Sequence, residues 1–486
     1  MNMKRPLIGA LAFFSLLSSA FAQQAPWGRA DIPISSRDRV YAADQTSNTV
    51  SVIDPATNKL LGVIRLGDPV PGALSALYKG QLLVHGLGYS SDSKTLAVVS
   101  IASNSVTLID TATNKVKGTV YVGRSPHEAF FTPDGRELWV TVRGEDYVSV
   151  IDPMGMREIR RIQVANGPGM TMFGPDGRYG FVCSSFTPEL AVIDTTSHQI
   201  IKRVPQSSPF CPNIAVSPEN DEVWITLKDV GKVQVFGAKP PFDQIALLDT
   251  GPITNHVNFA NNRNGKFAYL TIGGTNEVKA YRRGAKPELV AAIPVGDLPH
   301  GIWPSGDGTR VYVALENGEH AVAIDTLSNK VIATIAIGQT TQALVYVPGA
   351  VPNGDGTANL MPLGVAGEAL HIEMLPPSGA SSTARATVAV NSLGVIDLLQ
   401  IAVAGLQPGQ EYQLFLVDSP TKPDATRVGL TKFTANPSGA AVAQAIGPLR
   451  TVVGTAGDAP GQQAGQRYLV LTVAGTDQLV LQQRTP

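Results

Sequence analysis

The chain alternates apolar and polar residues over short stretches that are separated by turns. A period of two residues is typical of strands with one buried face, and it is seen at Trp139, Thr141, Tyr147, Ser149 and Ile151. Turns containing glycine end such stretches, because glycine adopts the positive φ angles that reverse a chain sharply. Examples are Pro133-Asp134-Gly135, Pro175-Asp176-Gly177 and Gly306-Asp307-Gly308. The pattern predicts an all-β protein.

One unit of this pattern runs from Gly123 to Val164, and the same order of strands and turns returns along the chain. Each unit closes with a strand that ends in Val-Ile-Asp, Leu-Ile-Asp or a degenerate equivalent. The closing residues are Asp54, Asp110, Asp152, Asp194, Gly237, Arg282 and Asp325. Their spacings of 56, 42, 42, 43, 45 and 43 residues predict one four-stranded blade per repeat and therefore a seven-bladed β-propeller.

Two segments resemble a known repeat family. Tyr41-Ala42-Ala43-Asp44, followed by Val52-Ile53-Asp54-Pro55-Ala56-Thr57-Asn58-Lys59, and later Val106-Thr107-Leu108-Ile109-Asp110-Thr111-Ala112-Thr113-Asn114-Lys115, are similar to the YVTN-type propeller repeat of YncE-like periplasmic proteins. The resemblance covers residues 39–348 and implies the propeller fold. It implies no single function, because relatives are described as surface-layer components, DNA binders and redox-associated propellers.

The chain divides into segments of different character. We expect the propeller at residues 23–348, with Gln342–Val347 completing the first blade, because Tyr41 begins that blade at its second strand. Residues 349–365 are rich in turn formers and are a predicted linker. Residues 366–486 are predicted to form a small antiparallel β-sandwich, with strands at 386–390, 398–403, 411–417, 440–444 and 467–473.

Residues 1–22 have the pattern of a secretory signal peptide. Lys4 and Arg5 precede an apolar run that is too short to span a membrane, and Ala20-Phe21-Ala22 supplies a cleavage site. We therefore expect a periplasmic or secreted protein. Removing the two basic residues from the total of 38 leaves 36 against 39 acidic residues, a net charge of −3. This overall charge does not favour nucleic-acid binding.

The only two cysteines are Cys183 and Cys211. Alignment of the repeats places Cys183 near the end of the second strand of one blade and Cys211 at the start of the innermost strand of the next. A disulfide is therefore feasible in an exported protein, and two free buried thiols are the alternative. The absence of a Cys-x-x-Cys-His sequence excludes covalently attached c-type haem.

An insertion lengthens the repeat between Asp68 and Val84, since the first spacing exceeds the second by 14 residues. It precedes an innermost strand, so we expect it over one mouth of the central channel. Loops on a rigid scaffold often carry function; a tolerated surface insertion is the alternative.

Four of the seven histidines fall at or beside one position of the repeat, where the innermost strands begin. These are His85, His127, His256 and His300, and Gln342 holds the position in the last strand. We expect these five residues to line a ligand site at a channel mouth. Neutral imidazoles suit transition metals, so His85, His127 and His300 are a candidate copper or zinc site. Polar lining without a metal is the alternative.

Familiar catalytic motifs are absent, since the sequence has no GxSxG, HExxH or P-loop pattern and no GxGxxG after a strand. We expect a binding or scaffolding protein with a small molecule, a metal ion or a protein at the channel mouth. The alternative is a metal-dependent enzyme or redox partner. A weaker alternative is single-stranded DNA binding through two basic clusters, which are Arg157, Arg160 and Arg161, and Arg282, Arg283 and Lys286.

Overall fold

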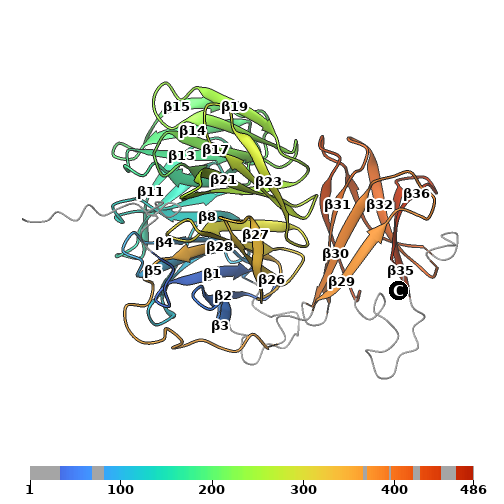
Figure 1. The fold of residues 1–486 in the computed structure, drawn as a ribbon, viewed down its shortest axis with the longest axis horizontal. Helices are drawn as coiled ribbons and strands as arrows, with labels where there is room; N and C mark the ends of the chain where they lie inside the picture. The colour runs from blue at the N-terminus through green and yellow to red at the C-terminus, as the bar shows by residue number, and fades with distance from the viewer. Residues whose placement is uncertain are drawn as a thin grey trace, which may run out of the picture.

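The computed structural model describes residues 33–67, 82–364, 369–392, 396–419, 427–449 and 467–484. The named elements of these residues are all β-strands, which form seven four-stranded sheets and one eight-stranded sheet. Figure 1 shows the propeller beside a smaller second domain. The predicted fold class is thus confirmed. The expected signal peptide and most of the insertion after Asp68 lie outside the described residues.

Each blade runs from an innermost strand to an outermost strand. Blade 1 contains β28 (Thr341–Val347), β1 (Arg39–Asp44), β2 (Thr49–Asp54) and β3 (Lys59–Arg65). Blade 2 contains β4 (Val84–Tyr89), β5 (Thr95–Ser100), β6 (Ser105–Asp110) and β7 (Lys115–Tyr121). Blade 3 contains β8 (Pro126–Phe131), β9 (Leu138–Val142), β10 (Tyr147–Asp152) and β11 (Arg157–Gln163).

The other four blades repeat this arrangement. Blade 4 contains β12 (Pro168–Phe173), β13 (Tyr179–Ser184), β14 (Glu189–Asp194) and β15 (Gln199–Pro205). Blade 5 contains β16 (Ile214–Val216), β17 (Glu222–Leu227), β18 (Lys232–Gly237) and β19 (Gln244–Asp249). Blade 6 contains β20 (Thr254–Asn262), β21 (Gly265–Ile272), β22 (Glu277–Arg282) and β23 (Glu288–Pro294), and blade 7 contains β24 (Pro299–Pro304), β25 (Arg310–Leu315), β26 (His320–Asp325) and β27 (Lys330–Ala336).

The ring closes in the first blade, as the sequence predicted. Strand β28 pairs antiparallel with β1, so the last propeller strand joins the first. The buried Asp44 carboxylate reinforces this joint, because it accepts hydrogen bonds from Thr49 and Ser51 of β2 and from Thr341 of β28. Closure thus gives β1 a partner on its inner edge.

The seven residues that closed the sequence repeats are the last residues of the seven third strands. Where the residue is aspartate, its carboxylate accepts hydrogen bonds from the turn that follows. Asp110 accepts from the backbone N–H and the hydroxyl of Thr113, and Asp194 accepts in the same way from Ser197. These aspartates therefore cap turns, which is a structural role.

The second domain is one eight-stranded antiparallel sheet with the order β33-β32-β35-β36-β29-β30-β31-β34. Its outer strands β33 and β34 contact each other, so the sheet is nearly closed around its own apolar core. The five expected strands are present, and β29, β33 and β36 are additional. The strands are β29 (Leu370–Leu375), β30 (Arg385–Ser392), β31 (Asp397–Ala404), β32 (Glu411–Val417), β33 (Val428–Thr434), β34 (Ala441–Gly447), β35 (Tyr468–Val473) and β36 (Leu479–Gln483).

The predicted linker lies along the propeller for much of its length. Met361 forms a β-bridge with Val63 of blade 1, and the Asn114 side chain of blade 2 donates to the carbonyls of Gly356 and Ala358. These hydrogen bonds satisfy backbone groups of a segment that has no strand partner over most of its length.

Cys183 and Cys211 form a disulfide between blade 4 and the segment that leads into blade 5, with a Cα–Cα distance of 6.0 Å. The bond closes a loop of 28 residues. Both cysteines are fully buried, so the bond lies within the propeller core.

We expect the Cys183→Ala/Cys211→Ala variant to lose about 3 to 4 kcal/mol of unfolding free energy, because the unfolded chain regains the entropy that the closed loop removes. Urea unfolding of the variant and of the oxidised parent protein measures the difference. A loss below about 1 kcal/mol would contradict the entropic account. Reduction of the disulfide in the parent protein should cause the same loss of unfolding free energy. Because reduction keeps both cysteine side chains, this control distinguishes the effect of the bond from the effect of the smaller alanine side chains.

Candidate functional site at the propeller mouth

Four histidines lie where innermost strands begin, at one end of the central channel that we call the propeller mouth. His85 is on β4, His127 on β8, His256 on β20 and His300 on β24. Each is only 5% exposed. Strand starts from different blades meet at one end of the ring, so the sequence repeat brings these imidazoles together although they are far apart in the chain.

The histidines form two pairs rather than an even ring. The rings of His85 and His127 have centroids 4.3 Å apart, and those of His256 and His300 are 4.5 Å apart. The first pair belongs to blades 2 and 3 and the second to blades 6 and 7. Among the described residues, His85 and His127 belong to a group of donor atoms that lie within 4.8 Å of one another, and His300 is not part of that group.

Backbone carbonyls of neighbouring blades fix the orientation of one ring in each pair. His127 Nδ1 lies 2.8 Å from the carbonyl oxygen of Gly169, and His300 Nδ1 lies 2.6 Å from that of Gln342. A carbonyl only accepts, so Nδ1 carries the proton and Nε2 keeps a lone pair. This is the arrangement that orients metal-binding histidines. Gln342 takes part in the site through this backbone carbonyl.

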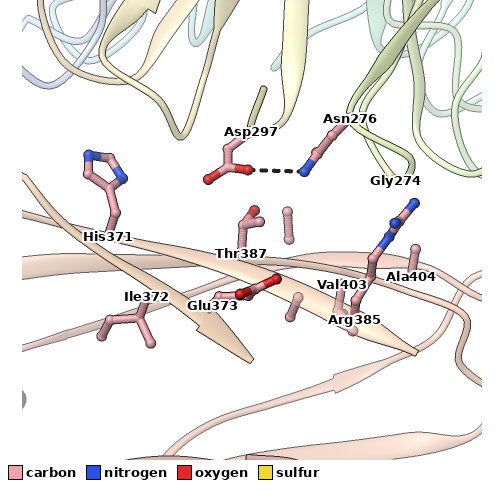
Figure 2. A pocket seen from close by; sticks show the side chains of 13 residues that line it. Gly274, Asn276, Asp297, His371, Ile372, Glu373, Arg385, Thr387, Val403 and Ala404 are labelled. Carbon is pink, nitrogen blue, oxygen red and sulfur yellow. Dashed lines mark hydrogen bonds between the residues drawn. The ribbon is translucent and has the colours of Figure 1, made fainter. Parts of the chain in front are cut away.

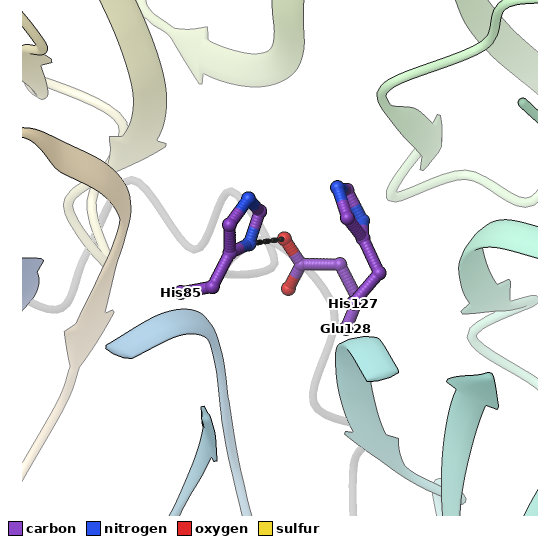
Figure 3. A group of neighbouring side chains, drawn as sticks. All are labelled: His85, His127 and Glu128. Atoms are coloured by element: carbon purple, nitrogen blue, oxygen red, sulfur yellow. Dashed lines mark ion pairs between the residues drawn. The ribbon is translucent and has the colours of Figure 1, made fainter. Parts of the chain in front are cut away.

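A buried carboxyl group that was absent from our candidate residues completes the first pair. Glu128 follows His127 on β8, and its Oε1 lies 3.9 Å from His85 Nδ1. Figure 3 shows the three side chains converging on one space. One donor atom from each of His85, His127 and Glu128 lies within 4.8 Å of the others. An acidic residue directly after His127 in the strand Pro-His-Glu-Ala-Phe-Phe was the sequence signal for it.

The donor spacing fits one transition-metal ion after a small adjustment. Two donors bound to the same tetrahedral zinc or copper ion through bonds of about 2.1 Å lie about 3.4 Å apart, so donor atoms that are up to 4.8 Å apart approach one another by up to about 1.4 Å on binding. His85 Nδ1 and Glu128 Oε1 are buried and have no hydrogen-bond partner among the described residues. His85 Nδ1 can offer a lone pair to an ion in the tautomer that carries the proton on Nε2, and Glu128 Oε1 can do so once the carboxyl is ionised.

Burial controls the protonation of the site. It lowers the pKa of His85 to about 3 and those of His127, His256 and His300 well below the usual range, with Arg143 or Lys228 nearby adding to the effect. Burial also raises the pKa of Glu128 to about 8. At neutral pH the imidazoles are neutral, as metal binding requires.

The second pair faces a different carboxylate. His300 Nε2 lies 3.9 Å from Glu316 Oε2, an atom that is buried and has no hydrogen-bond partner among the described residues. Glu316 Oε1 accepts a hydrogen bond of 2.7 Å from Gln400 of the second domain. A polar chain thus connects the mouth with β31.

The second domain covers part of the mouth. Its contacts fall on the loops that precede first strands or follow second strands, which lie at the same end of the ring as the histidines. Gln400 contacts Glu316 and Asn317, and His371 Nε2 lies 3.1 Å from Glu319 Oε2. Apolar residues of both domains pack beside these contacts, namely Ile253, Leu298, Ala402, Ala404 and Ala440.

A small cavity lies among the innermost strands. Its volume is about 20 Å³, and its lining includes the polar residues Glu128, Asn213, His256 and Asn258 and the apolar residue Trp303. This volume is sufficient for about one water molecule.

Comparisons with known proteins identify the fold. No protein-family model matches the chain, and no curated protein matches it. Solved structures do match, among them hydrazine synthase of Kuenenia stuttgartiensis with 21% identity, a TM-score of 0.50 and coverage of 55% of this chain and 90% of that one. A functionally unknown protein from Desulfotomaculum acetoxidans DSM 771 has 12% identity, a TM-score of 0.54 and coverage of 63% and 98%.

The periplasmic gluconolactonase PpgL of Pseudomonas aeruginosa also matches, with 18% identity, a TM-score of 0.51 and coverage of 64% of this chain and 99% of that one. At these identities the likeness shows the fold alone. The chain is a seven-bladed β-propeller protein with an added β-domain, and this fold fits a binding or scaffolding role. Among the described residues, no helix has the length and apolar character that crossing a membrane requires.

Proposed function

We propose that the protein is an exported binding protein that holds one transition-metal ion, copper or zinc, at the propeller mouth. The ligands are His85, His127 and Glu128. The observation that carries the proposal is the convergence of their donor atoms within 4.8 Å in a buried space. The proposal replaces His300 of the sequence-based set with Glu128.

The chemistry of the three donors supports a cation. Two neutral imidazoles and one carboxylate suit copper and zinc. Hydrogen bonds stabilise the ionised form of Glu128 only weakly, because Oε1 has no partner among the described residues and burial raises the pKa of the carboxyl. A bound cation supplies the positive charge that stabilises the ionised carboxylate, and it displaces the proton. A four-coordinate ion then has one position left for water or an external ligand.

Metal titration of untagged, chelator-treated protein tests the proposal. We expect one Cu²⁺ or Zn²⁺ ion per chain by calorimetry and elemental analysis, and release of about one proton per ion at pH 7 because Glu128 ionises. The His85→Ala/His127→Ala variant should bind at least about a hundredfold more weakly, and Glu128→Gln at least about tenfold. His320→Gln, which changes a histidine of β26 outside both pairs, is the matched control.

Two results would overturn the assignment. One is the absence of a stoichiometric ion in the parent protein. The other is binding that survives in the double variant and is lost in His256→Gln/His300→Gln, which would place the ion at the second pair. Circular dichroism of each variant shows whether the fold is retained.

We also propose a periplasmic or extracellular location. The N-terminal sequence pattern and the presence of a disulfide, which oxidising compartments favour, support it. Recovery of the full-length chain with intact residues 1–22 from the cytoplasm of its native host would argue against this location.

A further inference from the structure

A second cavity lies between the propeller and the second domain, away from the four histidines. Its volume is about 370 Å³, within the range of small-molecule sites. One wall consists of loops of blades 6 and 7 and the other of strands β29, β30 and β31. Figure 2 shows Asp297 and Asn276 on the propeller side and Glu373, Thr387 and Arg385 on the other side.

Two of the four titratable side chains that line this cavity have ion-pair partners. Glu373 Oε2 lies 2.9 Å from Arg484 NH1, and His371 Nε2 lies 3.1 Å from Glu319 Oε2. The first pair balances its own charge, and the second does so when His371 is protonated, a form that the raised pKa of His371 favours. The other two charged side chains are therefore the ones available to bind a charged ligand.

Two groups of opposite charge remain, one on each wall. The Asp297 carboxylate accepts one hydrogen bond of 3.0 Å from Asn276 and forms no ion pair with the described residues. The Arg385 side chain forms no hydrogen bond or ion pair within the described part of the chain. Between them the wall is apolar, with Ala386, Val403 and Ala404.

We propose that this cavity binds a small zwitterion, an amino acid or short peptide, whose ammonium group contacts Asp297 and whose carboxylate contacts Arg385. Arginine recognises a carboxylate through two parallel hydrogen bonds, and a carboxylate is the natural partner of an ammonium group. The alkyl part of such a ligand packs on the apolar wall. A ligand with only one of the two charges leaves one of these side chains without a partner.

The position of Asp297 supports a cationic group on the propeller side. Burial raises the pKa of this carboxyl; His371 opposes the rise and Glu373 adds to it. A cation next to Asp297 relieves the unfavourable burial of its charge. The ligand would also connect the two domains, because its two ends contact different walls.

Calorimetric titration of the full chain with defined probes tests the proposal. The zwitterionic probes are γ-aminobutyrate, 6-aminohexanoate and glycylglycine, and the singly charged controls are hexanoate and hexylamine. We expect at least one zwitterion to bind with a dissociation constant below about 1 mM. Asp297→Asn and Arg385→Gln should each weaken that binding at least about tenfold, whereas the exposed-residue controls Asp249→Asn and Arg136→Gln should not.

Three results would overturn the proposal. They are no binding of any zwitterion at about 10 mM, equal binding of hexanoate or hexylamine, and zwitterion binding that neither cavity variant weakens. The same titration of His85→Ala/His127→Ala should be unchanged, because the metal ligands lie outside this cavity. The two proposals can therefore fail separately.

Discussion

Acidification below about pH 6.5 should destabilise the metal-free propeller steeply. Burial lowers the pKa of His85 to about 3 and also lowers the pKa values of His127, His256 and His300. Below pH 6.5 the unfolded chain takes up protons at these histidines and the folded chain does not. The contribution of these histidines to the stability of the folded state relative to the unfolded chain is therefore full above about pH 6.5 and is lost as the pH falls below that value.

Two carboxyl groups with large pKa shifts oppose this trend. The pKa of Glu128 is raised to about 8 and that of Asp44 to about 6, mainly by burial, so in the folded state they hold protons that they lose on unfolding. The raised pKa values of Asp229, Asp297 and His371 act in the same direction, with smaller shifts. Four histidine protons favour unfolding and about two carboxyl protons oppose it, which leaves at most about two. At about 1.4 kcal/mol per proton and pH unit, stability should fall by up to about 3 kcal/mol per pH unit near pH 5.5.

Urea unfolding at pH 7, 6 and 5, followed by tryptophan fluorescence, measures this slope. The His127→Gln/His300→Gln variant keeps a donor near each backbone carbonyl but removes two titrating groups, so its slope should be lower by about 2 to 3 kcal/mol per pH unit. A variant with the same slope as the parent protein would show that the histidines are not the source. Between about pH 4.5 and pH 8, Glu128→Gln should remove the loss of stability with rising pH that the raised pKa of Glu128 causes.

The sequence was sufficient for the architecture because the repeat is a local pattern. Blades 2 to 7 are each built from four consecutive strands, so equivalent positions of the sequence repeat, such as Asp110 and Asp152, take equivalent places in successive blades. Closure was predictable for the same reason, because β28 had no blade after it and β1 lacked an inner partner. The five strands expected in the second domain follow from alternation alone.

The candidate site was predictable only in part. The position of a histidine in the repeat placed it at the mouth, but ring contacts form between neighbouring blades, so His300 pairs with His256 and not with His85. Glu128 was missed because a lone acidic residue in a strand usually faces solvent. The contact of Gln400 with Glu316 depends on the docking of two domains, which no periodicity in either domain encodes.

Arg283, which belongs to the second of the two basic clusters, has a structural role. The Arg283 side chain is 2% exposed and contacts the carboxylates of Glu219, Asp221 and Glu222 at 2.7 to 2.9 Å. Its guanidinium also lies over the Phe259 ring at 4.8 Å. The hypothesis of single-stranded DNA binding therefore loses one of its six basic residues, because a buried and paired guanidinium is not free to contact phosphate.

Arg283→Met should destabilise the propeller by about 3 kcal/mol or more, because removing the cation leaves three carboxylates close together. Glu222 is the most affected, since its side chain is 11% exposed and solvates poorly once the cation is gone. Urea unfolding measures the loss. Arg282→Met is the matched control, since Arg282 is exposed, and we expect a change of about 0.5 kcal/mol or less there. A similar small loss in Arg283→Met would mean that the carboxylates find other partners, and Lys266, which lies 3.0 Å from Glu219, is the nearest candidate.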